Sequence, residues 1–306
     1  MTAPADLPLV SILTPSFNQG RFLRDCLCSV ARQTYERIEH VVADGDSTDE
    51  SPAILAEAGD AVRWTSEPDC GQADAVNKAF EASTGEIVGW VNSDDGLFAV
   101  DTVERVVAAF VRHPEASVVY GDAALVGESG RILRHYRSRW PAGSLPLASP
   151  VAQPAAFFRR SVIEPGEALL RVELHRFLDY ELWLRLRTRG VRFVHLPAVV
   201  AVDRDHLERK VRTTDEVFVS ESAELVEEYG PVFAVPRFRR LGGLVRRVQG
   251  LPEVWRWERH EPAFPWSVDG RVRRLVRQVA RPDPVQLSAE QRQFGREVAG
   301  VRKRRS

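Results

Sequence analysis

The chain has few cysteines and lacks the segments that direct a protein into a membrane. Only three of its 306 residues are cysteine, and Cys26, Cys28 and Cys70 are wrongly spaced for a zinc site or a disulfide framework, which favours a reducing compartment. No basic segment followed by an apolar one opens the chain, and the longest apolar run, at 193–202, is interrupted by His195 and Pro197. We therefore expect no signal peptide and no membrane span, and a protein that acts in the cytoplasm, at most peripherally on the inner membrane face.

Glycine-rich phosphate loops are also absent. Neither the G-x-G-x-x-G pattern nor the G-x-x-x-x-G-K pattern occurs, so a bound phosphate would be held by side chains and a metal. The hydrophobic share of 44% is enough to bury a large core at this length. The chain is expected to form one large domain, or one domain with an extension.

The net charge of −1 hides an asymmetry between the two parts of the chain. Residues 231–306 contain 18 Lys and Arg but 7 Asp and Glu, a surplus of 11, so the first 230 residues carry −12. We therefore divide the chain into a domain at 1–230 and a basic, mainly helical extension at 231–306. A basic extension suits anionic lipid, nucleic acid or plain solvent.

The aromatic residues of the extension bear on this choice. Trp255, Trp257, Phe264 and Trp266 lie among arginines that alternate with apolar residues, a composition typical of an interfacial helix on an anionic membrane. An ordinary solvated helix or an oligomer contact remains open as an equal alternative. The rest of the chain favours lipid over nucleic acid, so we expect no nucleic-acid partner.

Strand and helix patterns alternate along the first hundred residues. An apolar strand from about Pro8 runs into a polar turn that ends near Asn18. Further elements are predicted as helices at 21–33, 51–58 and 74–81 and strands at 38–43, 62–66 and 87–91. Such alternation predicts a parallel sheet with crossover helices, whose binding crevice lies at the carboxyl ends of the strands.

A polar cluster follows the apolar strand at 87–91 directly. Asp94 and Asp95 are adjacent carboxylates, which are costly to bury unless a cation or strong donors neutralise them. A divalent metal such as Mg²⁺ or Mn²⁺, with a substrate diphosphate as co-ligand, is the natural partner. The alternative is that Asp94 caps a helix while Asp95 is solvated.

The second half of the domain offers weaker patterns. It predicts helices at 101–113 and 214–229, strands at 117–120, 191–196 and 198–202, a hairpin at 123–140 and a charged loop at 203–210. Gln153 precedes an apolar strand and either touches an acceptor or bonds to backbone. Asp179 falls in the first turn of another predicted helix, where the helix dipole stabilises an ionised carboxylate. A helix cap and a catalytic base both account for it.

Four segments of this chain resemble the successive motifs of the family 2 glycosyltransferases with the GT-A fold. They are Thr14-Pro15-Ser16-Phe17-Asn18, Asp44-Gly45-Asp46-Ser47-Thr48-Asp49, Glu67-Pro68-Asp69-Cys70-Gly71 with Asp74-Ala75-Val76-Asn77-Lys78, and Asn92-Ser93-Asp94-Asp95. The resemblance extends to about residue 215. It implies an α/β fold with a Rossmann-like, mostly parallel sheet flanked by helices.

The resemblance also implies a set of site residues. The donor nucleotide sugar would be held by Thr14, Pro15, Ser16, Phe17, Asn18, Asp44, Asp74, Asn77, Lys78, Asn92, Ser93 and Asp94. Asp94, Asp95 and His206 would hold Mn²⁺ or Mg²⁺, and Asp179 would be the catalytic base. Gln153, Arg204 and Lys210 are candidates for contact with the acceptor or the diphosphate.

Three positions depart from the common family pattern. Val76 stands where many members have Arg, Asn92 where many have the first Asp of a D-x-D motif, and Leu178 where an acid is frequent. The first departure removes a positive charge, for which Lys78 can substitute, and the second leaves the metal to Asp94 and Asp95. The N-S-D-D variant resembles bacterial polysaccharide-type members.

The function that this resemblance implies is an inverting transfer of a sugar from a nucleotide sugar, with UDP favoured. The acceptor would be a hydroxyl of a glycan or of a lipid-linked molecule in cell-surface polysaccharide synthesis. Two alternatives are a sugar nucleotidyltransferase and an inactive nucleotide-sugar-binding protein. The first would require a Gly-rich start with a basic residue. The sequence leaves the oligomeric state open.

Overall fold

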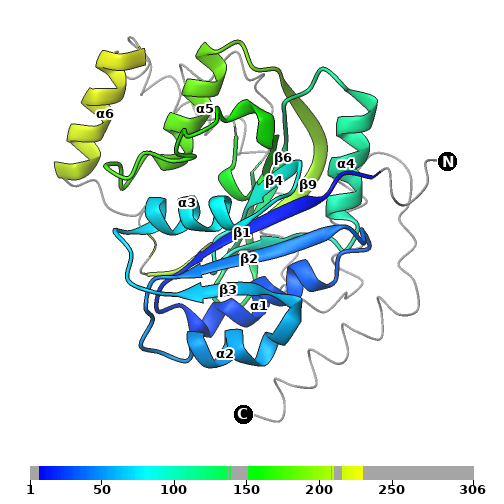
Figure 1. Ribbon diagram of the computed structural model, residues 1–306, viewed down its shortest axis with the longest axis vertical. Coiled ribbons are helices and arrows are strands. Elements are labelled where there is room, and N and C mark those ends of the chain that lie inside the picture. The colour runs from blue at the N-terminus through cyan, green and yellow to red at the C-terminus, as the bar shows by residue number, and fades with distance from the viewer. Residues whose placement is uncertain (1–6, 137, 139–150, 208, 210–215, 230–306) are drawn as a thin grey trace.

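The computed structural model describes residues 7–136, 138, 151–207, 209 and 216–229. These residues form an α/β fold in which helices cover both faces of one sheet (Figure 1). Within the described residues the sheet has nine strands, eight of them in the order β3-β2-β1-β4-β8-β6-β9-β5, and β7 pairs with β6. The predicted basic extension lies outside the described residues.

The first half of the sheet is parallel, as predicted. Four parallel strands lie side by side, namely β1 (Val10–Ser16), β2 (Ile38–Asp44), β3 (Arg63–Ser66) and β4 (Ile87–Trp90). The crossover helices are α1 (Gly20–Ala31), α2 (Ser51–Ala58) and α3 (Gln72–Ala82). Their polar loops therefore meet at one edge of the sheet, where the carboxyl ends of the strands lie.

The second half of the sheet is mixed. Strand β8 (Ala156–Arg159) is antiparallel to β4 and to β6 (Val118–Gly127), and β6 forms a hairpin with β7 (Ile132–Tyr136). The short strand β5 (Gly96–Leu97) closes the order beyond β9 (Phe193–Asp205). The helices of this half are α4 (Thr102–Arg112), α5 (Leu178–Thr188) and α6 (Glu216–Tyr229). The predicted hairpin is present, and β6 is longer than the predicted strand.

The prediction of two strands at 191–196 and 198–202 is wrong, because β9 continues through Pro197. Proline removes a donor from the ladder and is tolerated in sheets only at an edge or an irregularity. The pairing of β9 with β6 is irregular at this point, since its register jumps from His195 opposite Tyr120 to Val199 opposite Asp122. The predicted charged loop is also partly wrong, because β9 extends to Asp205.

Alternate residues of the strands feed two cores on opposite faces of the sheet. Leu13, Val88 and Trp90 pack with α3 and α5 on one face, whereas Ile12 and Ile87 pack with α1 and α4 on the other. This period of two is expected for strands covered on both faces. Helices on both sides thus hold the strand ends in place below the polar loops.

Candidate active site

A pocket of about 870 Å³ lies at the carboxyl ends of β1, β2 and β4. Many of the predicted site residues line it, namely Pro15, Ser16, Phe17, Asn92, Ser93, Asp94, Asp95, Gln153, Asp179 and His206. The other predicted residues with described side chains, Thr14, Asn18, Asp44, Asp74, Asn77, Lys78 and Arg204, do not line it. Lys210 lies outside the described residues.

The adjacent carboxylates Asp94 and Asp95 differ in environment. Asp95 is buried, accepts a hydrogen bond from the Arg204 backbone N–H at 3.0 Å and another from Asn92 Nδ2 at 3.1 Å. Burial, then the charges of Asp94 and Asp203, raises the pKa of Asp95 well above its usual range. The helix-cap alternative for Asp94 is wrong, because the chain continues into β5 at Gly96 and α4 begins only at Thr102.

Asp94 is paired with the histidine that directly follows β9. Its Oδ2 lies 2.8 Å from Nε2 of His206, which is buried and packs its ring 5.0 Å from that of Phe22. Arg204 supports this arrangement through two hydrogen bonds. Its guanidinium donates to the Asp94 carbonyl at 2.9 Å and to Asp25 at 3.0 Å. Arg204 therefore positions the pair and does not itself face the pocket.

The residues present fit a divalent metal that is completed by a substrate. No group of three or more His, Cys, Asp and Glu side chains that could hold a metal occurs in the described parts of the chain. Asp94 and His206 nevertheless offer a carboxylate and an imidazole side by side in the pocket. Mg²⁺ and similar ions are commonly held by one or two protein ligands together with substrate phosphates. The donor set therefore suits a metal–diphosphate complex.

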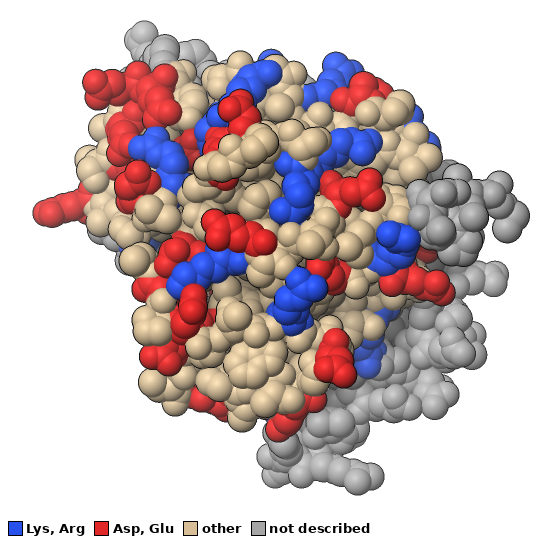
Figure 2. All heavy atoms as spheres, viewed as in Figure 1, with Lys and Arg blue, Asp and Glu red and all other residues tan. Residues whose placement is uncertain are grey.

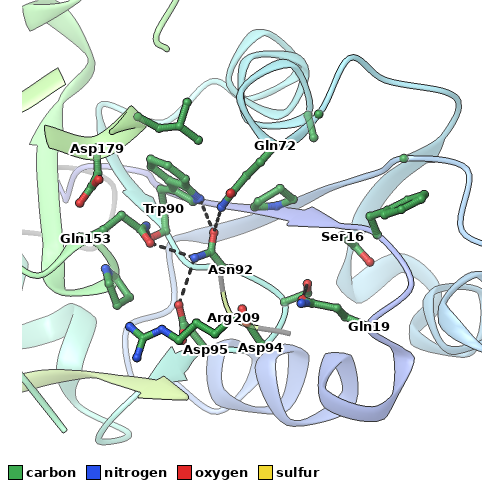
Figure 3. A pocket seen from close by; sticks show the side chains of 18 of the residues that line it. Ser16, Gln19, Gln72, Trp90, Asn92, Asp94, Asp95, Gln153, Asp179 and Arg209 are labelled. Carbon is green, nitrogen blue, oxygen red and sulfur yellow. Dashed lines mark hydrogen bonds between the residues drawn. The ribbon is translucent and has the colours of Figure 1, made fainter. Parts of the chain in front are cut away.

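Asn92 is the centre of a hydrogen-bond network on the pocket wall (Figure 3). Its Oδ1 accepts from Trp90 Nε1 and Gln72 Nε2, both at 2.8 Å. Its Nδ2 donates to Asp95 and to Gln153 Oε1 at 3.0 Å. An aspartate here would have no N–H to donate and would add a third carboxylate. The asparagine of the N-S-D-D segment is therefore matched to the buried Asp95.

Of the two roles that the sequence left open for Gln153, the bond to backbone is present, and contact with an acceptor stays a prediction. Gln153 opens a short 3₁₀ turn at Gln153–Ala155, directly before strand β8. Its Nε2 donates to the Trp90 carbonyl at 2.5 Å, so the backbone contact is present. The side chain also lines the pocket.

Asp179 occupies the first turn of α5 and lines the same pocket. Burial raises the pKa of this carboxyl to about 6, against the opposing effect of the backbone N–H groups of Tyr180 and Asp179. An acid with this pKa is mainly ionised at pH 7 and can still take up a proton. The preceding segment is held from α6, because the backbone N–H groups of His175, Arg176 and Phe177 donate to Glu221.

Some residues of the first motif, at 14–18, line the pocket, and others bond to neighbouring parts of the protein. Phe17 lines the pocket with 61% of its surface exposed. Thr14 is buried behind it and donates to the Val91 carbonyl at 2.8 Å. Asn18 accepts the Thr48 backbone N–H at 2.9 Å. Thr14 therefore ties β1 to the residue that follows β4, and Asn18 ties the loop after β1 to the loop after β2.

Asp44 and Asn77 are committed to internal partners. Asp44 is buried and accepts hydrogen bonds from Ser47 and Ser66. The Asn77 carboxamide exchanges two hydrogen bonds with the Leu170 backbone, each 2.8 Å long. These positions give both residues structural partners beneath the pocket, and their contact with a donor stays a prediction.

Several pocket residues were not identified from the sequence. They are Gln19, Gly45, Asp46, Asp69, Gln72, Trp90, Tyr136, His175, Arg176, Asp203 and Arg209, among others. Most are single polar residues without a local pattern that marks a site. Gly45, Asp46, Asp69, Asp203 and Arg209 are exceptions, since they lie within motifs or the charged loop that the sequence analysis noted.

The segment of the chain that shows its family also supplies most of this pocket. The sequence profile of glycosyl transferase family 2 matches residues 11–176. The chain belongs to this family. None of the helices in the described residues is long and apolar enough to cross a membrane.

Curated relatives of this family 2 member include glycosyltransferases from two bacterial genera. A PGL/p-HBAD biosynthesis glycosyltransferase of Mycobacterium tuberculosis is 32% identical over 163 residues, which cover 51% of this chain and 60% of the relative. An uncharacterized glycosyltransferase of Rickettsia felis is 28% identical over 203 residues, 61% of this chain and 33% of the relative. The match thus spans about 60% or less of the length of these relatives.

Solved structures share the fold. S. aureus TarS 1-349 in complex with UDP-GlcNAc aligns with a TM-score of 0.57 and 18% identity, covering 71% of this chain and 66% of that one. A mannosyltransferase from Pyrobaculum calidifontis, in complex with GDP-Man and Mn²⁺, aligns with a TM-score of 0.50 and 25% identity, covering 66% and 59%. The predicted GT-A fold is confirmed.

Proposed function

We propose that this family 2 protein is an inverting glycosyltransferase that uses a nucleoside diphosphate sugar, with UDP favoured as the nucleotide. The acceptor is a hydroxyl group of a glycan or of a lipid-linked molecule in the synthesis of cell-surface polysaccharide. The observation that carries the proposal is that the Asp94–His206 pair and Asp179 line one pocket. In the view of Figure 3, Asn92 and Gln153 lie between Asp179 and Asp94.

The Asp94 side of the pocket suits the leaving group. Asp94 and His206 would hold Mn²⁺ or Mg²⁺, which when bound neutralises the charge that develops on the diphosphate. The similarity to a mannosyltransferase in complex with GDP-Man and Mn²⁺ supports this assignment. The backbone and side-chain contacts of Arg204 keep Asp94 and Asp95 in place without occupying the pocket.

The Asp179 side suits the acceptor. Asp179 takes the proton of the acceptor hydroxyl while the oxygen of that hydroxyl attacks the anomeric carbon. The bond from the anomeric carbon to the diphosphate breaks as the new bond forms. Attack from the face opposite the diphosphate inverts the configuration. A pKa of about 6 places the base close to physiological pH, where proton transfer to a side chain is effective.

A panel of nucleotide sugars tests the donor half of the proposal. The protein is titrated with UDP-, GDP-, dTDP- and ADP-linked sugars by calorimetry, with and without Mn²⁺. We expect affinity for at least one nucleotide sugar that depends on Mn²⁺ and is lost in Asp94→Asn. Asp101→Asn is the matched control, because Asp101 pairs with Arg105 beside α4 and does not line the pocket.

The stereochemical half is tested separately. The donor that binds is incubated with glycan and lipid-linked acceptors, and the anomeric configuration of the product is read by NMR. An inverted product supports the single displacement. A product with retained configuration, or Mn²⁺-dependent affinity that survives in Asp94→Asn, would contradict the assignment.

A further inference from the structure

A carboxylate from the loop before α3 lies against the loop after β2. A Cβ built on Gly45 would fall 2.4 Å from Oδ2 of Asp69 and 3.3 Å from Cδ2 of Phe17. The first distance is too short for a side chain and the second is tight, so Gly45 leaves open the space that the Asp69 carboxylate occupies. Gly45, Asp69 and Phe17 all line the pocket.

The loop that carries Asp69 is fixed by its own hydrogen bonds. Asp69 Oδ1 accepts the Gly71 backbone N–H at 2.7 Å, and Asp74 accepts that of Cys70 at 3.0 Å. Lys78 donates to the Pro68 carbonyl at 2.9 Å. Gly71 has φ +111, a conformation that favours glycine. Asp74 and Lys78, predicted to touch the donor, thus position the loop, and Asp69 Oδ2 is held beside Gly45.

The acid that ends β2 already has partners within the protein. Asp44 is buried and its oxygens accept hydrogen bonds from Ser47 and Ser66. Asp46 also lines the pocket, but the Asp69 carboxylate and the exposed ring of Phe17 share the space beside Gly45, and that ring offers a stacking surface for a planar base.

We propose that Asp69 selects the base of the donor nucleotide. An ionised carboxylate has only acceptors, so it favours a base whose pairing edge presents a ring N–H, as uracil, thymine and guanine do. Cytosine and adenine present an unprotonated ring nitrogen there, so a carboxylate aligned with that ring position gains no hydrogen bond from it. The inference rests on the proposed function, because it assumes that the pocket binds a nucleoside diphosphate.

The test is the affinity of the full chain for UDP, GDP, CDP and ADP, measured by calorimetry with Mn²⁺. UDP or GDP is expected to bind roughly ten- to a hundredfold more tightly than CDP and ADP, the difference that a hydrogen bond to a charged group makes. In Asp69→Asn, Oδ1 can still accept the Gly71 N–H, whereas an amide donor replaces Oδ2. The preference is expected to fall at least tenfold, with CDP gaining relative to UDP.

Asp46→Asn is the matched control. Asp46 lines the same pocket and has φ 64, a conformation that asparagine tolerates, so the change removes one charge without strain. It is expected to leave the base preference unchanged. Gly45→Ala provides a second variant, because its Cβ would displace the Asp69 carboxylate, and it should lower the same preference.

The outcomes separate this inference from the proposed function. Binding of UDP or GDP with a preference that survives in Asp69→Asn and Gly45→Ala would overturn the role of Asp69 and leave the proposed function standing. An equal loss in Asp46→Asn would replace direct recognition by a general effect of charge and also overturn it. Absence of binding of every diphosphate to the unaltered protein would contradict both.

Discussion

The surroundings of Asp179 move the pKa of its carboxyl away from that of an ordinary aspartate. It lies in the first turn of α5, yet burial outweighs the backbone N–H groups there and raises its pKa to about 6. The expectation that the helix start alone would keep it ionised therefore captured only the smaller effect. A group with this pKa can accept a proton from an acceptor hydroxyl and release it to solvent near neutral pH.

Replacement of Asp179 by asparagine is expected to separate catalysis from donor binding. The amide keeps the shape of the side chain but cannot take a proton, so turnover should fall by about 10²- to 10⁴-fold. Donor affinity should change little, because Asp94 and His206 are the residues assigned to the diphosphate. Initial rates and calorimetric titration of the same preparation measure the two quantities. Equal losses in rate and in donor affinity would make Asp179 a donor ligand.

The pH dependence of turnover follows from the same group. Because the base must be ionised, kcat/KM is expected to rise with pH through about 6 and then level off. The pH dependence of folding stability should run in the opposite direction. A folded-state pKa of about 6 against the ordinary 3.8 contributes stability below pH 3.8 that is lost as the pH rises through 6.

Asp179→Asn removes this effect, so the variant should become more stable relative to the unaltered protein as the pH rises from about 4 to 7. Urea unfolding at several pH values, beside the pH–rate profile, measures both. A rate that does not change between pH 5 and 7 would argue against Asp179 as the base.

At the scale of elements, the sequence predicts the parallel half of the fold well and the contacts between distant elements poorly. The alternation of apolar strands and amphipathic helices locates β1 to β4 and α1 to α3, because each signal is local. The path of β9 through Pro197 depends on an irregular pairing with β6, which no local pattern reveals.

The same distinction holds within the site. Phe17, the Asn92–Asp95 segment, Asp179 and His206 were predicted and line the pocket. Asp44 and Asn77 were also predicted but bond to internal partners. A polar residue in a loop has the same sequence signature whether its side chain points into the pocket or beneath it. Gln72 and Trp90 were missed because their role depends on Asn92, 20 and 2 residues away.

Helix α6 holds the segment before α5 through one buried acid. The Glu221 carboxylate is 5% exposed and accepts the backbone N–H groups of His175, Arg176 and Phe177 at 2.6, 2.9 and 3.2 Å. Phe218 packs on Phe177 with ring centroids 4.9 Å apart. These contacts fix the segment that leads into the first turn of α5, where Asp179 lies.

Loss of the Glu221 carboxylate is therefore expected to destabilise the fold and loosen this segment. Glu221→Ala would leave three backbone donors without their acceptor, which should lower the free energy of unfolding by on the order of 2–3 kcal/mol. KM for the acceptor should rise, while the affinity for the donor remains. Urea unfolding and acceptor titration measure these effects.

Glu227→Ala on the exposed side of α6 is the matched control and should leave both quantities unchanged. Equal behaviour of the two variants would mean that Glu221 does not hold the segment. An effect on donor affinity as large as that on the acceptor would place its role elsewhere in the pocket.

Across the whole molecule, the charge of the chain is divided between its two parts. Figure 2 shows acidic and basic side chains interspersed over the described surface on this face, without a large patch of one sign. The sequence places a surplus of 11 positive charges in residues 231–306, against −12 in the first 230. The prediction of an interfacial helix concerns residues outside those that the structure describes, and it stays a prediction.

A membrane role for the basic extension can be tested by the attachment of the protein to vesicles. Each Lys or Arg near an anionic surface contributes about 1 kcal/mol, so a few engaged residues among the 18 would hold the chain there. Their alternation with Val, Leu and Trp would add apolar contact that salt does not weaken.

We therefore expect the full chain to co-sediment with vesicles that contain anionic lipid at low ionic strength, and less so as salt is added, because screening shortens the reach of the charges. Vesicles of neutral lipid provide the control for charge, and a chain that ends at Tyr229 provides the control for the extension. Because that shorter chain retains α6 and every described residue of the pocket, its donor affinity reports whether it is folded. Equal sedimentation of both chains, or of neither, would favour a solvated or oligomer-forming extension and a soluble acceptor.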